Sequence, residues 1–195
     1  AFTGDFLLFA YALALGRFFT VAAALDTGSA FEGMGGAREA TYACLAEPAL
    51  FFGMMALVKV TGGVSLSTML GPGLAGVWSA AGASIVLVVA ALFIVLLAEA
   101  CRIPFDDPNT HLELTMIHEV MVLDHGGPAL ALIQYGAALK LYLFAALVVR
   151  IALPIDAGGP VSARVFAVAS MAALAIAVGV VESVMARLRL TQIPS

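Results

Sequence analysis

Charged residues are scarce in this chain, and their scarcity excludes most water-soluble folds. Only 11% of the 195 residues are Asp, Glu, Lys or Arg, whereas 63% are hydrophobic and the mean hydropathy is +1.07. A soluble domain has about 25% charged and about 45–50% apolar residues, and it could not hide so much apolar surface from water. We therefore expect an integral membrane protein.

Cysteine and basic residues are also sparse. Cys44 and Cys101 form no CxxC pair, so the sequence indicates neither a disulfide framework nor a cysteine-ligated metal or iron–sulfur site. Nine Lys and Arg against thirteen Asp and Glu give a formal charge of −4, which argues against nucleic acid as a partner. Spacing assigns no Ser, His or Cys nucleophile set, so we predict no catalytic residue, no bound cofactor and no metal in this chain.

Five apolar windows are long enough to cross a bilayer, for which a helix needs about 20 residues. They cover residues 6–25, 40–58, 74–98, 128–149 and 165–185. The runs are continuous and rich in Ala and Leu, which favours helices over the alternating strands of a membrane barrel. We expect an all-α integral membrane protein with about five transmembrane helices in a single domain, residues 1–195, plus a partly helical acidic interfacial segment.

Acidic residues gather on one side of this predicted bundle. Five spans place the loop 26–39, the segment 99–127 and the C-terminal tail on one side, and nine of the thirteen acids fall there. The loop 61–73 on the other side has no charge. Four basic residues against three barely favour an orientation by the positive-inside rule. One face of the protein is therefore rich in acidic residues and the other has few of them.

The densest charge lies in EACRIPFDDPNTHLELTMIHE, residues 99–119, directly after a long run without charge. Its two prolines interrupt regular helix, and a new helix is expected from about residue 110 to residue 124, packed on the membrane domain or at its surface. His111 and His118 share one face of that helix, but HExxH is absent and no cysteine joins them. The spacing therefore does not indicate a metal site, and composition alone favours a solvated interfacial helix over a functional segment.

Three ionisable residues lie deep inside predicted spans, whereas Glu182 lies near the end of the last one. A charge at the bilayer centre costs at least roughly 2.5 kcal/mol. Arg17 lies in the first span, Glu47 in the second beside Pro48, and Lys140 in the fourth. Lysine and glutamate can take either charge state once removed from water, so Lys140 and Glu47 suit a proton relay, whereas Arg17 stays protonated and suits a counter-charge. A static ion pair that fixes helix register explains the same residues equally well.

Four blocks of sequence, spread over nearly the whole chain, resemble one known family. ExxRxPFD, with Glu99, Arg102 and Asp106, resembles the signature loop of respiratory complex I subunit 1. The continuation PNTHLELTMIHE resembles the branch formed by the membrane subunits of energy-converting [NiFe] hydrogenases and formate hydrogenlyase. GRFF with LDTGSAFEGMGGARE, then LAEP, and finally ESVMARLRL resemble further blocks of that branch. Asn109 and His111 replace two glutamates of the quinone-reducing branch, which favours the hydrogenase branch.

The resemblance implies a non-redox membrane subunit that docks a soluble redox arm and couples it to proton or sodium translocation. Implied partners are the lipid bilayer, hydrogenase-like soluble subunits and antiporter-like membrane subunits, with a [NiFe] centre and iron–sulfur clusters in those partners. The family has about eight helices, so we expect this chain to be part of a longer one, in a prokaryotic inner membrane with its acidic face cytoplasmic. A quinone-site subunit of a complex I-type NADH dehydrogenase, a stand-alone ion transporter and a passive anchor are the alternatives.

The candidate functional residues divide by expected role. Candidates for a proton or ion pathway are Glu39, Glu47, Glu99, Asp106, Glu113, Glu119 and Lys140. Candidates for counter-charge or docking are Arg17, Arg38, Arg102, Asp107, His111, His118 and Asp124. The glycines of the loop 26–39 do not form a phosphate-binding motif, so we expect them to permit tight packing against another subunit.

Overall fold

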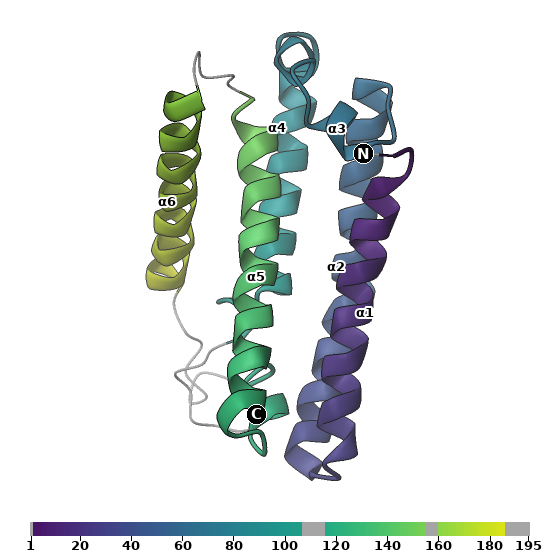
Figure 1. The fold of residues 1–195 in the computed structure, drawn as a ribbon, viewed down its shortest axis with the longest axis vertical. Helices are drawn as coiled ribbons and strands as arrows, with labels where there is room; N and C mark the ends of the chain where they lie inside the picture. The colour runs from purple at the N-terminus through teal and green to yellow at the C-terminus, as the bar shows by residue number, and fades with distance from the viewer. Residues whose placement is uncertain (1, 107–115, 155–159, 186–195) are drawn as a thin grey trace, which may run out of the picture.

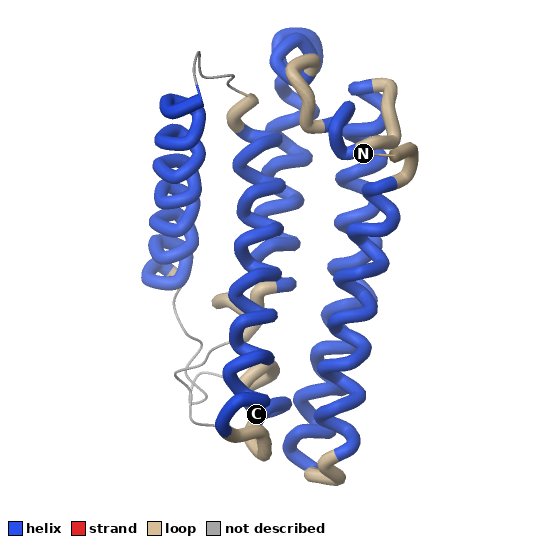
Figure 2. Tube along the Cα trace, in the orientation of Figure 1, coloured by secondary structure: helices blue, strands red, loops and turns tan. Residues whose placement is uncertain are grey.

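The computed structural model describes residues 2–106, 116–154 and 160–185, and long helices dominate them. These are α1 (Asp5–Asp26), α2 (Ala30–Thr61), α4 (Leu74–Glu99), α5 (Gly127–Ala152) and α6 (Pro160–Val184). Five helices in the described part are long and apolar enough to cross a membrane. The prediction of an all-helical membrane protein with five spans is therefore confirmed, and Figures 1 and 2 show the helices standing along a common axis.

The helices pack as a bundle around α2 and α4, which share the most extensive contact. In Figure 1, α1 lies along α2, α5 lies along α4, and α6 stands at the outer edge beside α5. The best-buried side chains between α2 and α4 include Met54, Leu57, Leu92 and Leu96. Large apolar side chains also cover the outside of the bundle, as a surface in contact with lipid requires.

The second helix differs most from its predicted span. The sequence placed residues 26–39 in a loop, but α2 begins at Ala30 and includes residues 30–39. Glycine disfavours helix, yet Gly35 has a packing reason: a Cβ there would lie 3.0 Å from both the Ile117 carbonyl oxygen and Met121 Cγ. At Gly35 the close packing is therefore with this chain's own segment, and not with another subunit as the sequence suggested.

The segment after α4 also departs from prediction. Helix α4 ends at Glu99, partway along α5, and residues 116–126 lie at the end of the bundle where α5 begins (Figure 1). Over residues 116–126 the only regular element is the 3₁₀ turn η1 (Val120–Val122), so the expected α-helix is wrong in its described part. Side chains bind the backbone of this segment and compete with helical hydrogen bonds, as described below.

A short helix, α3 (Leu66–Met69), lies in the connection at the opposite end of the bundle. Asp5 at the start of α1 accepts hydrogen bonds there from the Ser65 hydroxyl and the Leu66 N–H, at 3.1 and 2.6 Å. Trp78 also donates its indole N–H to the Ile151 carbonyl, at 2.8 Å. These bonds hold the helix ends together at the end of the bundle opposite the acidic face.

Candidate functional site

The guanidinium of Arg17 gathers three carboxylates from two other helices. Its Nε donates to Glu39 Oε1 at 3.1 Å, and its two Nη groups bind Glu47 and Glu99. Arginine presents five N–H donors in a planar fork, so one guanidinium can bind several carboxylates at once. Sequence reasoning expected Arg17 to act as a counter-charge, and the structure supplies the carboxylates that it faces.

Lys140 of α5 completes this group, which we call the charge cluster: Arg17, Glu39, Glu47, Glu99 and Lys140. The ammonium Nζ lies 3.6 Å from Glu99 Oε2. The Glu99 side chain is only 3% exposed, while that of Glu47 is 40% exposed. With every group in its ordinary ionised form, three carboxylates face two cations. The cluster then carries one net negative charge, and uptake of one proton neutralises it.

Helix spacing and helix ends position these side chains. Glu39 and Glu47 stand eight residues apart on α2, about 80° apart around its axis, and both carboxylates reach Arg17 of α1. Glu99 is the last residue of α4, so the end of that helix brings its carboxylate between α1 and α5. The sequence assigned Glu99 to an interfacial loop, but it lies in the bundle interior instead. Four helices thus contribute to one polar centre within the apolar bundle.

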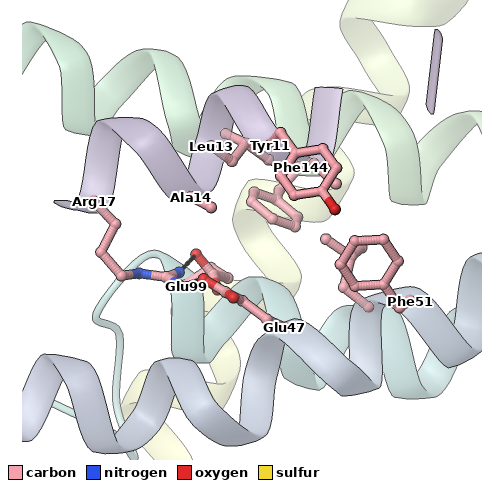
Figure 3. A pocket seen from close by; sticks show the side chains of 10 residues that line it. Tyr11, Leu13, Ala14, Arg17, Glu47, Phe51, Glu99 and Phe144 are labelled. Carbon is pink, nitrogen blue, oxygen red and sulfur yellow. Dashed lines mark hydrogen bonds and ion pairs between the residues drawn. The ribbon is translucent and has the colours of Figure 1, made fainter. Parts of the chain in front are cut away.

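A small cavity of about 50 Å³ borders this centre. Figure 3 shows Arg17 reaching toward Glu47 and Glu99 at one end, with aromatic rings such as Phe51 and Phe144 at the other. Apolar side chains exclude water and strengthen the ionic contacts. On this side the cluster therefore borders a small and mainly apolar space, beside which the Glu47 side chain is 40% exposed.

A larger cavity of about 470 Å³ lies on the other side of the cluster, between α1 and α5. Its polar walls include Arg17, Glu39, Lys140 and His118, and the rest is mainly apolar. His118 belongs to the segment after α4, so this cavity links that segment with three members of the cluster. We call it the α1–α5 cavity.

Asp106 anchors residues 116–126, which we call the interfacial segment. Its carboxylate is buried and accepts the backbone N–H groups of Ile117, at 3.1 and 3.2 Å, and of His118, at 3.0 Å. Arg38 donates to the Met116 carbonyl oxygen at 3.0 Å. The sequence made Asp106 a candidate for a proton or ion pathway and Arg38 a candidate for counter-charge or docking; in the structure both hold the backbone of their own chain.

Two titratable groups outside the helices have shifted pKa values. Burial lowers the pKa of His118, and the nearby Lys140 ammonium acts in the same direction. Burial, with the Glu39 carboxylate beside it, raises the pKa of Cys101 to about 12. The Cys101 thiol donates a hydrogen bond to Glu39 Oε2 at 3.7 Å. His118 is therefore mainly neutral at pH 7, and Cys101 stays protonated.

The remaining predicted residues lie apart from the cluster. Arg102 pairs with Glu182 of α6 at 3.5 Å, with both side chains partly exposed. Glu119 and Asp124 are exposed on the interfacial segment. Asp107, His111 and Glu113 lie outside the described residues. Within the ranges that are described, no three His, Cys, Asp or Glu side chains are arranged to hold a metal ion.

Glu32 is a buried acid to which sequence reasoning gave no role. It is fully buried in the first turn of α2, and its Oε1 accepts the Asp124 N–H at 2.9 Å. Its Oε2 has no hydrogen-bond partner. Glu32 and Glu39 are separated by seven residues, so a helical projection of this stretch would have placed both on the face of α2 that packs against residues 116–124.

Comparison with known proteins places this bundle in a family. A family model described as NADH dehydrogenase matches residues 1–195. The chain belongs to the complex I subunit 1 family. Family membership and the five membrane-length helices together make it a multi-pass membrane protein. The family resemblance predicted from the PFD loop is therefore confirmed.

Two relatives of this family member come from Escherichia coli (strain K12). Hydrogenase-4 component C is 34% identical over 151 residues, which cover 77% of this chain and 46% of the relative. Formate hydrogenlyase subunit 4 is 28% identical over 198 residues, which cover 98% of this chain and 63% of the relative. The chain thus spans about half to two thirds of the length of these relatives, both of which are named as hydrogenase or hydrogenlyase components.

Proposed function

We propose that this chain is a non-redox membrane subunit of an energy-converting [NiFe]-hydrogenase or formate-hydrogenlyase-like complex. It docks a soluble redox arm on its acidic face and couples the chemistry of that arm to translocation of protons or sodium ions. The names of the two relatives support the class of complex. The observation that carries the coupling role is the charge cluster, in which Glu99 is shared between Arg17 and Lys140.

The geometry supports coupling because Glu99 faces two cations. Binding of a proton to its carboxylate removes the charge that holds Lys140, while Arg17 keeps Glu39 and Glu47 as partners. Lys140 is then free to exchange its own proton or to move into the α1–α5 cavity that it lines. Arg17 remains charged throughout and serves as the fixed centre.

The complex that this proposal requires has further members. Hydrogenase-like soluble subunits carry the [NiFe] centre and iron–sulfur clusters, and antiporter-like membrane subunits carry the rest of the ion pathway. The chain lies in a prokaryotic inner membrane, with the end of α1, the beginning of α2 and the interfacial segment toward the cytoplasm. Redox catalysis takes place in the partners, and this subunit converts their state into charge movement.

The partners are tested by purifying the full-length protein from its native membrane in a mild detergent, followed by mass spectrometry. We expect hydrogenase-like soluble subunits to co-purify in stoichiometric amounts. Recovery of NADH-oxidising subunits in their place supports a complex I-type assembly, and recovery of the protein alone supports a transporter. Either of these two results contradicts the proposal.

The coupling role is tested with Glu47→Gln and Lys140→Met in the complete complex, reconstituted into liposomes. Both variants should assemble, keep most of the redox turnover of the soluble arm, and lose at least tenfold of the ion translocation per turnover. Arg164→Gln, on the exposed face of α6, is the matched charge-removing control. Normal ion pumping in assembled Lys140→Met would contradict a role in coupling and leave the cluster as a static ion-pair network.

A further inference from the structure

His118 stands where the interfacial segment meets the charge cluster. It lines the α1–α5 cavity together with Arg17, Glu39 and Lys140. The interfacial segment contributes two described residues to that lining, Met121 and His118, and of these two His118 is titratable. The volume of the cavity, about 470 Å³, exceeds by far the roughly 30 Å³ that one water molecule occupies in the liquid, and its wall is polar enough to bind water.

The backbone that carries His118 is fixed on several sides. The buried Asp106 accepts its N–H, Arg38 holds the Met116 carbonyl, and Glu32 holds the Asp124 N–H. Gly35 of α2 allows the segment to lie directly on the helix. These contacts hold the backbone of His118 beside the cavity, so its imidazole stays within the lining that it shares with the cluster.

The charges around His118 favour its neutral form without making that form permanent. Lys140 of α5 lowers the pKa of His118 together with burial, and three carboxylates raise it. These carboxylates are Glu39 of α2, Asp106 after α4, and Glu119 of the same segment. Arg17 of α1 borders the same cavity. A neutral imidazole offers a ring nitrogen that accepts a proton, and burial near an ammonium favours its release again.

We propose that His118 is the proton-transfer residue between the α1–α5 cavity and the charge cluster. A hydronium ion in the cavity gives a proton to the imidazole nitrogen and leaves water. The new N–H bond then breaks as an O–H bond forms on a cluster carboxylate, with Glu39 the member that shares the cavity wall. The imidazole returns to its neutral state, the cluster loses its net charge, and no electron moves.

This inference rests on the proposed coupling function, and one experiment separates the two. Ion translocation and redox turnover are measured for the complete complex in liposomes between pH 5 and pH 8. Wild type should lose translocation per turnover as the pH falls through a midpoint below 6.5, because protonated His118 no longer accepts a proton. Absence of translocation in wild type at every pH contradicts the coupling function itself. Translocation with no inflection in this range contradicts the role of His118 alone.

His118→Gln and His118→Asn should lower translocation at least tenfold at pH 7 and abolish the inflection, with redox turnover retained. His125→Gln, at the other described histidine on the same segment, is the matched control and should keep the wild-type profile. An unchanged profile in an assembled His118 variant overturns the inference.

If neither His118 variant assembles, Glu119→Gln decides the question. Glu119 is exposed, so its replacement disturbs little packing. Its carboxylate raises the pKa of His118, so its removal should move the midpoint of translocation to lower pH. A midpoint that stays at the wild-type pH overturns the inference.

Discussion

The guanidinium of Arg17 and the carboxylate of Glu99 form a buried ion pair between residues 82 positions apart in the chain. Glu99 ends α4, Arg17 lies in the middle of α1, and Lys140 of α5 approaches the same carboxylate at 3.6 Å. One carboxylate therefore joins three helices. A change in its charge acts on all three at once.

Glu99→Gln should destabilise the protein more than Glu47→Gln does. Glu99 is almost fully buried and faces two cations, so its neutralisation leaves both with less compensation, at a cost on the order of 3 kcal/mol. Glu47 contacts Arg17 alone and its side chain is 40% exposed. Thermal unfolding of the purified complexes compares the two. An equal or larger loss of Tm in Glu47→Gln would show that Glu99 does not hold the helices together.

Arg17→Lys should not rescue the loss caused by Arg17→Gln, although it keeps the charge. An ammonium is a compact point charge and cannot reproduce the fork that binds three carboxylates of two helices. Both variants should reduce the amount of assembled complex in membranes, measured by native gel and immunoblot. Arg164→Lys on exposed α6 controls for expression. Wild-type assembly of Arg17→Lys would mean that charge alone suffices.

Gly35→Ala should weaken the contact between α2 and the interfacial segment. The new Cβ would lie 3.0 Å from the backbone carbonyl oxygen of Ile117, which cannot move without shifting the segment, and overpacking of this kind costs about 1–3 kcal/mol. Gly36→Ala is the matched control, because its Cβ meets only Val21 Cγ1 at 3.5 Å, an ordinary contact. Limited proteolysis within residues 116–126 should accelerate in Gly35→Ala only. Equal protection in both variants would contradict the close packing.

Cys101 should react slowly with maleimides at pH 8. Its pKa of about 12 leaves roughly one thiol in ten thousand ionised at that pH, against about a quarter of a thiol with the ordinary pKa near 8.5. Alkylation is followed by mass spectrometry in a Cys44→Ala background, which removes the other cysteine. The rate should rise upon unfolding in detergent by at least a hundredfold. Rapid labelling of the folded protein would place Cys101 in water.

Acid should destabilise the wild type more than His118→Gln. The folded state lowers the pKa of His118, so the unfolded chain binds the proton more tightly, and stability declines as the pH falls through about 6.5 toward the folded pKa. The difference in Tm between wild type and His118→Gln should therefore change in favour of the variant between pH 7 and pH 5. A difference independent of pH would show that His118 does not titrate in that range.

The sequence determined the membrane-spanning helices closely. In lipid, the backbone groups of a continuous apolar run can form hydrogen bonds only within their own helix. The predicted apolar windows therefore match four of the five long helices to within five residues at either end. The sequence did not predict the first ten residues of α2, because Gly, Glu and Arg lower the hydropathy of residues 30–39 without preventing a helix. Hydropathy reports contact with lipid, and this stretch packs against protein instead.

The sequence also singled out three of the five members of the cluster, from the cost of charge within apolar spans. It identified Arg17, Glu47 and Lys140 as residues in need of partners, but it did not pair them. Pairing depends on where α4 ends and on how far α5 lies from α1, and no pattern along one helix contains that information. Only the packed bundle placed Glu99 between Arg17 and Lys140, and only it turned Asp106 and Glu32 into anchors of the segment that carries His118. Composition decides which side chains cannot remain unpaired, and tertiary packing decides which partners satisfy them.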